Sequence, residues 1–209
     1  WDQEVPSFNT LAVECIAAPD AALVPRVPGL PDELFEHDGT MTKREVRAIT
    51  ISKLMPMRGA LLWDIGVGCG SVAVEWMRAA RYAQAIGIEP RADRRAMAGK
   101  NALFLGTPKL ELIDGLAPMA LVGLPTPDAI FIGGGLTNQV FEPAWAALKP
   151  LGRFVANAVT LESEKILIEL HEKYGGELSR LAVSRVEPVG QYHGWRSFMP
   201  VTQWSMVKR

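Results

Sequence analysis

Short apolar runs alternate along this chain with stretches of helical periodicity. The apolar runs, each followed by a helical pattern, occupy residues 60–65, 84–89, 109–113, 128–132 and 152–157. The helical patterns cover about 71–80, 92–104, 116–121, 137–147 and 161–173. Short apolar runs between helices are typical of strands buried on both faces. The alternation therefore predicts a mostly parallel sheet with helices on both faces.

The pattern changes at both ends of this region. Two strand patterns near 178–187 and 198–207 have no helix between them, which predicts an antiparallel terminal hairpin and seven strands in all. The long connection from Glu187 to Ser197 joins them. Ahead of the first strand, Thr42-Lys-Arg-Glu45 matches a capping box and predicts a helix beginning there.

Residues 1–36 differ from the rest. A strand-like stretch, Asn9 to Ile16, precedes a segment that contains Pro19, Pro25, Pro28 and Pro31. Such proline density predicts an extended linker, although a poorly ordered tail is the alternative. We place the domain at residues 37–209. The first residue is Trp1 rather than Met, which suggests a domain excised from a longer polypeptide.

A glycine-rich turn follows the first predicted strand. Glycine there permits backbone angles closed to other residues and lets a ligand lie against the main chain. The second strand ends at Glu89, where a carboxylate can hold the ribose hydroxyls of a nucleoside cofactor. The turn itself consists of Gly66, Val67, Gly68, Cys69 and Gly70. Of these, we interpret Cys69 as a small apolar filler, because no base adjoins it in sequence.

The acidic residue Asp64 distinguishes between two possible cofactors. A dinucleotide site places a pyrophosphate at the helix N-terminus, and a carboxylate beside the loop would repel it. The same carboxylate suits S-adenosylmethionine, which carries an ammonium and a sulfonium. The sequence D-x-G-x-G-x-G followed by Glu89 therefore predicts a Rossmann-like, S-adenosylmethionine-dependent methyltransferase fold of class I.

Three further groups stand where predicted strands end, and ligands of open α/β sheets bind at such ends. Asp114 either helps to enclose an adenine ring or caps the short helix that follows it. The run Gly133-Gly134-Gly135 permits close approach of a ligand, with a plain flexible turn as the alternative. Asn157 either contacts substrate or binds its own backbone in a turn.

Composition narrows the range of partners. The chain has 209 residues, 48% of them hydrophobic and 22% charged, which is ordinary for a globular protein. A net charge of −1 offers no basic surface for nucleic acid, and no apolar run approaches a membrane-spanning length. Two distant cysteines, Cys15 and Cys69, argue against disulfides or zinc and for the cytoplasm. No metal site is expected.

Several specific blocks resemble the C-terminal half of the decarboxylating precorrin methyltransferases of aerobic cobalamin synthesis. The chain is similar, more distantly, to the stand-alone carbon-15 enzymes of the anaerobic route. The blocks are Pro28–Pro31, Phe35–Gly39, Thr42–Arg47, Leu62–Gly66, His193–Arg196 and Met199–Trp204.

The resemblance implies methylation at carbon 15 of a precorrin-6B-type tetrapyrrole and removal of the ring C acetate carboxyl at carbon 12. S-adenosylmethionine is the implied cofactor. A homotetramer and an upstream methyltransferase domain on the same polypeptide are the implied partners. On this view residues 1–18 end the upstream domain and residues 19–36 form the linker.

The resemblance also assigns residues to the site. It implies cofactor contacts at Thr42, the loop Gly66–Gly70, Glu89, Gly115, Leu116 and Ala117, in addition to Asp64 and Asp114, which the motif and the strand ends already predict. Relatives often have an aspartate in place of Leu116, so Asp114 or a backbone carbonyl would have to replace that contact here. No catalytic acid or base is identified.

Substrate contacts are expected at Arg44, Arg47, Gly133–Gly135, Asn157, His193, Trp195 and Arg196. Trp195 would cover the flat face of the macrocycle and Arg196 would pair with its carboxylates. A methyltransferase acting on tRNA or protein, and a non-catalytic cofactor-binding module, remain alternatives. An enzyme acting on tRNA or protein should have a basic surface or an Asn/Asp-Pro-Pro-aromatic motif after the fourth strand. Here Gly133–Gly135 occupies that place.

Overall fold

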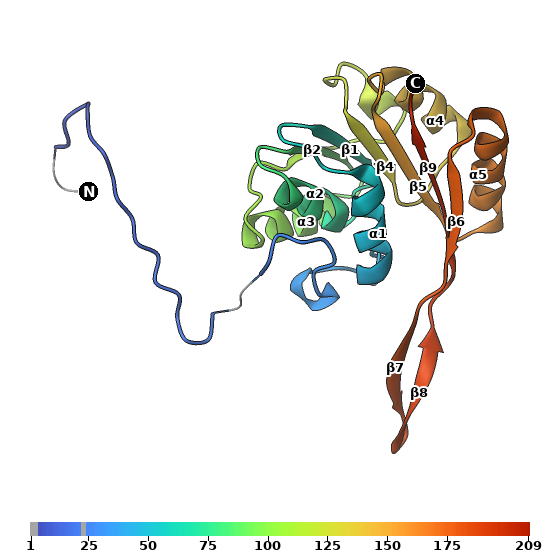
Figure 1. The fold of residues 1–209 in the computed structure, drawn as a ribbon, viewed down its shortest axis with the longest axis horizontal. Coiled ribbons are helices and arrows are strands. Elements are labelled where there is room, and N and C mark those ends of the chain that lie inside the picture. The colour runs from blue at the N-terminus through green and yellow to red at the C-terminus, as the bar shows by residue number, and fades with distance from the viewer. Residues whose placement is uncertain (1–3, 22–23) are drawn as a thin grey trace.

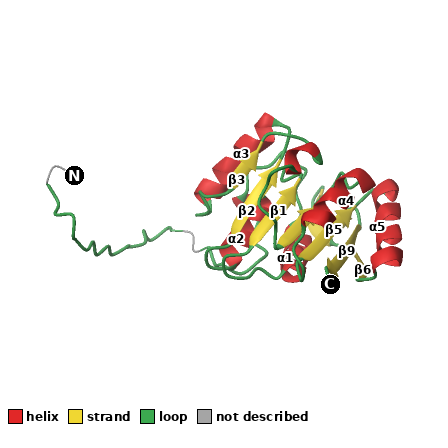
Figure 2. Ribbon diagram, turned by 90° about the horizontal axis from the view of Figure 1, so that it is seen from above, coloured by secondary structure: helices red, strands yellow, loops and turns green. Residues whose placement is uncertain are grey.

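The computed structural model describes residues 4–21 and 24–209, and parts of the predicted tail, residues 1–3 and 22–23, lie outside that description. One seven-stranded sheet, in the order β3-β2-β1-β4-β5-β9-β6, forms the centre of the domain. Helices flank it on both sides (Figures 1 and 2).

The strands are β1 Leu61–Ile65, β2 Gln84–Ile88, β3 Glu111–Ile113, β4 Ala129–Ile132, β5 Arg153–Ala158, β6 Glu177–Leu181, β7 Ser184–Val189, β8 Tyr192–Ser197 and β9 Val201–Val207. The helices are α1 Arg44–Leu54, α2 Ser71–Ala79, α3 Ala92–Phe104, α4 Asn138–Ala147 and α5 Leu161–Tyr174, with short 3₁₀ turns at Asp32–Leu34 and Met119–Leu121.

Strands β1 to β5 run parallel, and β9 lies antiparallel between β5 and β6. The predicted parallel sheet with an antiparallel edge is therefore confirmed. The strand order reverses between β1 and β4, which is where an open α/β sheet places its ligands.

Each face of the sheet has its own hydrophobic core. Successive residues of a strand point to opposite faces, so Leu62 joins the core under α1 and α2 while Trp63 joins the core under α4 and α5. Strands β1, β2, β4 and β5 are buried on both faces, which explains why they appear in the sequence as continuous apolar runs.

Helix α1 begins at Arg44, and the predicted capping box is wrong. The N-cap is Lys43, with no side-chain cap hydrogen bond. Thr42 instead offers its carbonyl oxygen to Nη1 of Arg47, at 2.7 Å. The Glu45 carboxylate does not return to the helix start either, because it accepts a hydrogen bond from Nη2 of Arg185 in β7 at 2.7 Å.

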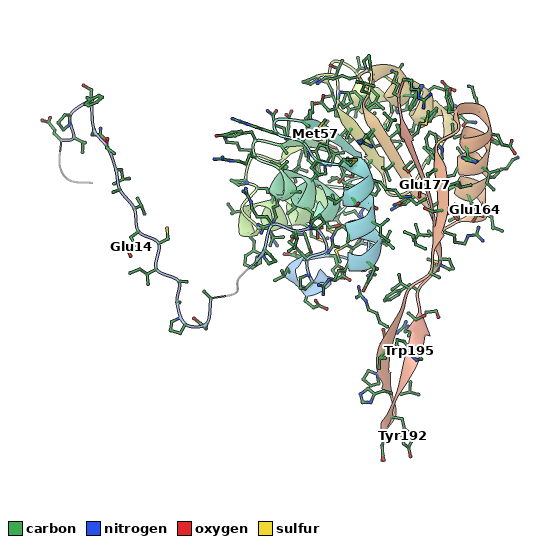
Figure 3. The ribbon with its side chains drawn as sticks, in the orientation of Figure 1. Glu14, Met57, Glu164, Glu177, Tyr192 and Trp195 are labelled. Atoms are coloured by element: carbon green, nitrogen blue, oxygen red, sulfur yellow. The ribbon has the colours of Figure 1, made fainter. Side chains whose placement is uncertain are left out.

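The predicted long connection from Glu187 to Ser197 is also wrong, because it folds as strand. Strands β7 and β8 form a separate two-stranded hairpin that projects from the body, with Tyr192 near its tip (Figures 1 and 3). Trp195 faces Val186 across the hairpin, and Arg196 faces Arg185. Trp195 and Arg196 are neighbours in one strand, so their side chains lie on opposite faces of the hairpin.

The N-terminal segment divides into two parts. Residues 4–21 form neither helix nor strand and are exposed throughout, so the strand expected at Asn9–Ile16 is absent. By contrast, Leu30 and Phe35 are buried against Val74 of α2 and Ala102 of α3. The division at residue 36 stays a prediction, although the residues just before it pack on the domain.

A buried guanidinium ties this segment to the helices. Arg47 is fully buried, and its Nε lies 2.6 Å from Glu75 of α2. Its Nη1 lies 3.1 Å from Asp32 in the linker. Glu75 also accepts from the backbone N–H groups of Gly29 and Leu30. Asp32 in turn pairs with Arg185 at 2.8 Å, so one ionic network joins linker, α1, α2 and the base of the hairpin.

Within residues 4–21 and 24–209, every helix is too short or too polar to cross a membrane.

We expect Arg47→Met to lower the free energy of unfolding by about 3–5 kcal/mol, because it leaves buried carboxylates without their cation. The matched control is Arg44→Met on the exposed side of the same helix, where a change within about 0.5 kcal/mol is expected. Urea unfolding followed by circular dichroism measures both. A loss below about 1 kcal/mol for Arg47→Met would mean that the network does not hold the linker.

Candidate functional site

A cavity of about 590 Å³ opens at the carboxyl ends of β1, β2, β4 and β5. Its walls come from the glycine loop, the segment Gly39–Lys43, the ends of β4 and β5, and the base of the hairpin. The lining residues are Gly39–Lys43, Val46, Asp64, Gly66–Cys69, Ser71, Val72, Glu89, Arg94, Phe131, Gly133–Gly135, Asn157, Val159, Leu181, Val183, Phe198, Met199 and Val201. Elements far apart in sequence thus meet at one site.

The glycine loop has the backbone geometry that its sequence requires. Gly66, Gly68 and Gly70 have φ values of +78°, +55° and +81°, in the left-handed region that favours glycine. An added Cβ at Gly70 would lie 3.1 Å from Cβ of Ala98 in α3. Gly87 of β2 leaves room for this loop, because an added Cβ there would lie 2.8 Å from Cγ2 of Val67.

Asp64 lies at the end of β1 and is almost fully buried. One of its oxygens, Oδ2, accepts the backbone N–H of Ala73 in α2 at 3.1 Å. Burial raises the pKa of Asp64 to about 7, and the nearby Glu89 adds to the effect, while the Ala73 N–H opposes it. A cation in the cavity would favour the ionised form.

Glu89 is held by the loop that it faces. Its Oε2 accepts from the backbone N–H of Gly68 at 3.2 Å, and its Oε1 accepts from that of Arg91 at 3.1 Å. The side chain lines the cavity at the carboxyl end of β2, as predicted from its spacing. Its fixed position suits a carboxylate that binds a pair of hydroxyls.

Asn157 belongs to a buried amide cluster on the cavity wall. Gln203 of β9 is fully buried, and its Nε2 donates to Asn157 Oδ1 at 2.8 Å and to Thr50 Oγ1 at 2.9 Å. Within the part of the chain that the structure describes, the Asn157 amide nitrogen makes one hydrogen bond, to Thr50 Oγ1 at 3.4 Å, so its second N–H group has no partner there. The backbone-turn alternative for Asn157 does not apply.

The three glycines after β4 line the cavity, and the reason for glycine differs from one position to the next. Gly133 is crowded by its own neighbour, because an added Cβ would lie 3.1 Å from the Phe131 ring. Gly134 faces open space, and Gly135 has φ +72°. Two of the three positions are therefore explained by local structure rather than by a ligand.

Several residues expected at the site lie elsewhere. Asp114 is largely exposed and pairs with Arg95 at 2.8 Å, and Gly115, Leu116 and Ala117 beside it do not line the cavity. Asp114 caps no α-helix, since the 3₁₀ turn after it begins at Met119 without a side-chain cap.

The structure does not place the expected substrate-binding residues Arg44 and Arg47 at this cavity. Arg47 is buried in its ionic network, and Arg44 is exposed outside the cavity. His193, Trp195 and Arg196 lie on β8 of the projecting hairpin, where Arg196 pairs with Glu187 at 2.9 Å. None of the three lines this cavity, and Trp195 and Arg196 point to opposite faces of the hairpin, so their contact with substrate stays a prediction.

Sequence reasoning missed Lys43, Arg94 and Phe198. Two features of the sequence could have pointed to them. Lys43 adjoins Thr42, an expected cofactor contact, and Phe198 directly precedes the Met199–Trp204 block. Arg94 is neutralised by Asp38 at 2.7 Å. The cavity is therefore acidic at the glycine loop, with Asp64 and Glu89, and cationic near the hairpin base, with Lys43.

Comparison with known protein families assigns the domain. The precorrin methyltransferase domain family matches residues 33–208, nearly the whole of the folded part. The chain belongs to the precorrin methyltransferase domain family. This membership confirms the resemblance given by the sequence blocks.

Individual relatives support the same assignment. A precorrin-6Y C(5,15)-methyltransferase (decarboxylating) of Sinorhizobium sp is 51% identical over 205 residues, covering 98% of this chain and 50% of the relative. The "probable cobalt-precorrin-6B C(15)-methyltransferase (decarboxylating)" of Pyrobaculum calidifontis is 35% identical, covering 83% of this chain and 93% of the relative.

A crystal structure of the C-terminal domain of precorrin-6Y C5,15-methyltransferase from Rhodobacter capsulatus has 47% identity and a TM-score of 0.83. It covers 88% of this chain and 100% of that one, and it supports the predicted fold class for this precorrin methyltransferase domain. This chain spans about half the length of the first curated relatives it matches.

The raised pKa of Asp64 predicts a pH dependence of stability. In the unfolded chain this carboxyl has its ordinary pKa of 3.8, so between about pH 4 and 7 the folded state binds the extra proton and loses stability as pH rises. Relative to Asp64→Asn, the wild type should lose up to about 1.4 kcal/mol per pH unit in that window and level off above it. Parallel profiles from urea unfolding between pH 5 and 7 would contradict this.

Proposed function

We propose that this domain uses S-adenosylmethionine to methylate carbon 15 of a precorrin-6B-type tetrapyrrole and removes the ring C acetate carboxyl at carbon 12. The observation that carries the proposal is the polarity of the cavity, acidic at the glycine loop and cationic at the hairpin base. A cofactor with a sulfonium and an ammonium suits the first end, and a substrate with many carboxylates suits the second. The names of the relatives support the same reaction.

The acidic end would hold the cofactor. S-adenosylmethionine, when bound, supplies a methyl group on a positively charged sulfur. Glu89, fixed by the Gly68 and Arg91 N–H groups, would accept the ribose hydroxyls. Asp64 would face the cationic part of the cofactor, and the glycines of the loop would let the cofactor lie against the main chain.

The other end would position the substrate. Leu181, Val183, Phe198, Met199 and Val201 form an apolar wall at the hairpin base that suits the face of a macrocycle. Asn157 would donate its second amide N–H group to a carboxylate or carbonyl oxygen. Methyl transfer depends mainly on holding the acceptor carbon near the methyl group, so positioning is the main contribution expected from these residues.

Decarboxylation requires that the electron pair of the broken carbon–carbon bond be taken up while carbon dioxide leaves. The conjugated macrocycle can accept that pair, and a proton from solvent then completes the methyl group left at carbon 12. The chain therefore needs to orient the acetate rather than to supply a redox group.

We also propose partners and a compartment for this domain. An upstream methyltransferase domain would account for the other half of the curated relatives. A homotetramer would cover the projecting hairpin, where Trp195 and Tyr192 are more than three-quarters exposed. The cytoplasm is the proposed compartment, since Cys15 and Cys69 are both free thiols.

We expect Glu89→Gln to weaken S-adenosylmethionine binding by about 1.5–3 kcal/mol, the usual contribution of a charged hydrogen bond. Asp114→Asn is the matched control, because this acidic residue also follows a strand but lies outside the cavity. Isothermal titration calorimetry should show unchanged affinity for the control. An equal loss of S-adenosylmethionine affinity in both variants would contradict this assignment and indicate an adenosine site near residues 114–117.

The reaction itself can be tested by mass spectrometry. With precorrin-6B and S-adenosylmethionine, the product should be heavier by one methyl group and lighter by carbon dioxide. Methylation without carbon dioxide loss would remove the decarboxylase half of the proposal. Cofactor binding without any turnover would favour a non-catalytic module, and methylation of tRNA or protein instead would favour the other alternative.

A further inference from the structure

Lys43 is a cation without a counter-ion at the cavity wall. Within residues 4–21 and 24–209 its ammonium group has no carboxylate within 4 Å, whereas Arg94, the other cation in the lining, pairs with Asp38. Lys43 also occupies the N-cap of α1. A positive charge is unfavourable there, because the helix dipole already places partial positive charge at its N-terminus. The helix terminus thus gives no reason for lysine at this position.

An aromatic ring holds Lys43 beside the apolar wall. The ammonium nitrogen lies 6.0 Å from the centroid of the Phe198 ring, and the Arg185 guanidinium lies 5.3 Å from the same centroid. Arg185 is itself fixed by Asp32 and Glu45, at 2.8 and 2.7 Å, and these two carboxylates neutralise it. Of the two cations at Phe198, Lys43 is therefore the one left to bind an anion in the cavity.

We propose that Lys43 is the cation of this cavity that binds a substrate carboxylate, with Phe198 and Arg185 as positioning residues. The inference rests on the proposed function for the identity of the substrate. A macrocycle lying on Phe198, Met199 and Val201 would present its peripheral carboxylates at the edge of the wall, where Lys43 stands. Cation and ring then bind different parts of one ligand: the ammonium its carboxylate, and the ring its apolar face.

The test compares Lys43→Met with Arg44→Met, which removes a neighbouring exposed cation outside the cavity. With precorrin-6B as substrate, Lys43→Met should raise KM about tenfold to a hundredfold, the effect of one lost charged contact. We expect kcat to change less than KM. Lys43→Arg should restore most of the affinity, and Arg44→Met should match the wild type.

Binding of uroporphyrin, a stable polycarboxylate porphyrin, gives a readout without turnover. Fluorescence titration should show the same loss for Lys43→Met, together with a weaker dependence on salt than in the wild type. The affinity for S-adenosylmethionine should be unchanged, because Glu89 and Asp64 hold that ligand at the other end. Thermal melts of each variant separate these effects from misfolding.

The outcomes separate this inference from the proposed function. Unchanged KM and porphyrin affinity in Lys43→Met, in a wild type that is active, would overturn the role of Lys43 and leave the function standing. Equal loss of cofactor and porphyrin affinity would overturn it as well, since Lys43 would then be structural. A wild type that binds porphyrin through Lys43 but does not turn over precorrin-6B would support this site and contradict the proposed reaction.

Discussion

The site depends on the buried guanidinium of Arg47. It joins Glu75 of α2 to Asp32 of the linker, and Asp32 carries the connection on to Arg185 at the base of the hairpin. A buried ion pair is tolerable when further hydrogen bonds satisfy its groups, and here Glu75 accepts from the backbone N–H groups of Gly29 and Leu30 while Arg47 donates to the carbonyls of Leu30 and Thr42. The N-terminus of α1, and with it Thr42 and Lys43, is placed at the cavity by this network. The linker is thus part of the framework of the site as well as a connection to what precedes it.

A second consequence of this packing is the distribution of charge in the cavity. Asp64 and Glu89 stand together at the glycine loop, where burial raises the pKa of Asp64 and a bound cation would favour its ionised form. Lys43 stands near Phe198 without a carboxylate of its own within the described residues. The two ends therefore prefer ligands of opposite charge, and a reaction between a sulfonium cofactor and a polycarboxylate substrate uses both preferences in one step.

Much of the fold could be predicted because its determinants are local. Strands buried on both faces appear as apolar runs, and the glycines of the loop are required by positive φ values at Gly66, Gly68 and Gly70. The hairpin could not be predicted from the same pattern, since Pro188, Gly190 and Gly194 weaken the strand signal and most of its residues are exposed. Arg47 was mistaken for a substrate ligand because its role depends on partners 15 and 28 residues away. Lys43 was missed because only its neighbours in the folded structure, such as Phe198, distinguish it from any other lysine at the start of a helix.

The central claim is that one polarised cavity holds both ligands, and a crystal structure of the chain with S-adenosylhomocysteine and uroporphyrin tests it most directly. We expect the ribose at Glu89, the amino-acid part of the cofactor product toward Asp64, and the porphyrin on Phe198 with a carboxylate at Lys43. Adenosine bound beside Asp114 and Leu116 away from Glu89, or porphyrin bound only along the outer hairpin at Trp195, would contradict the account.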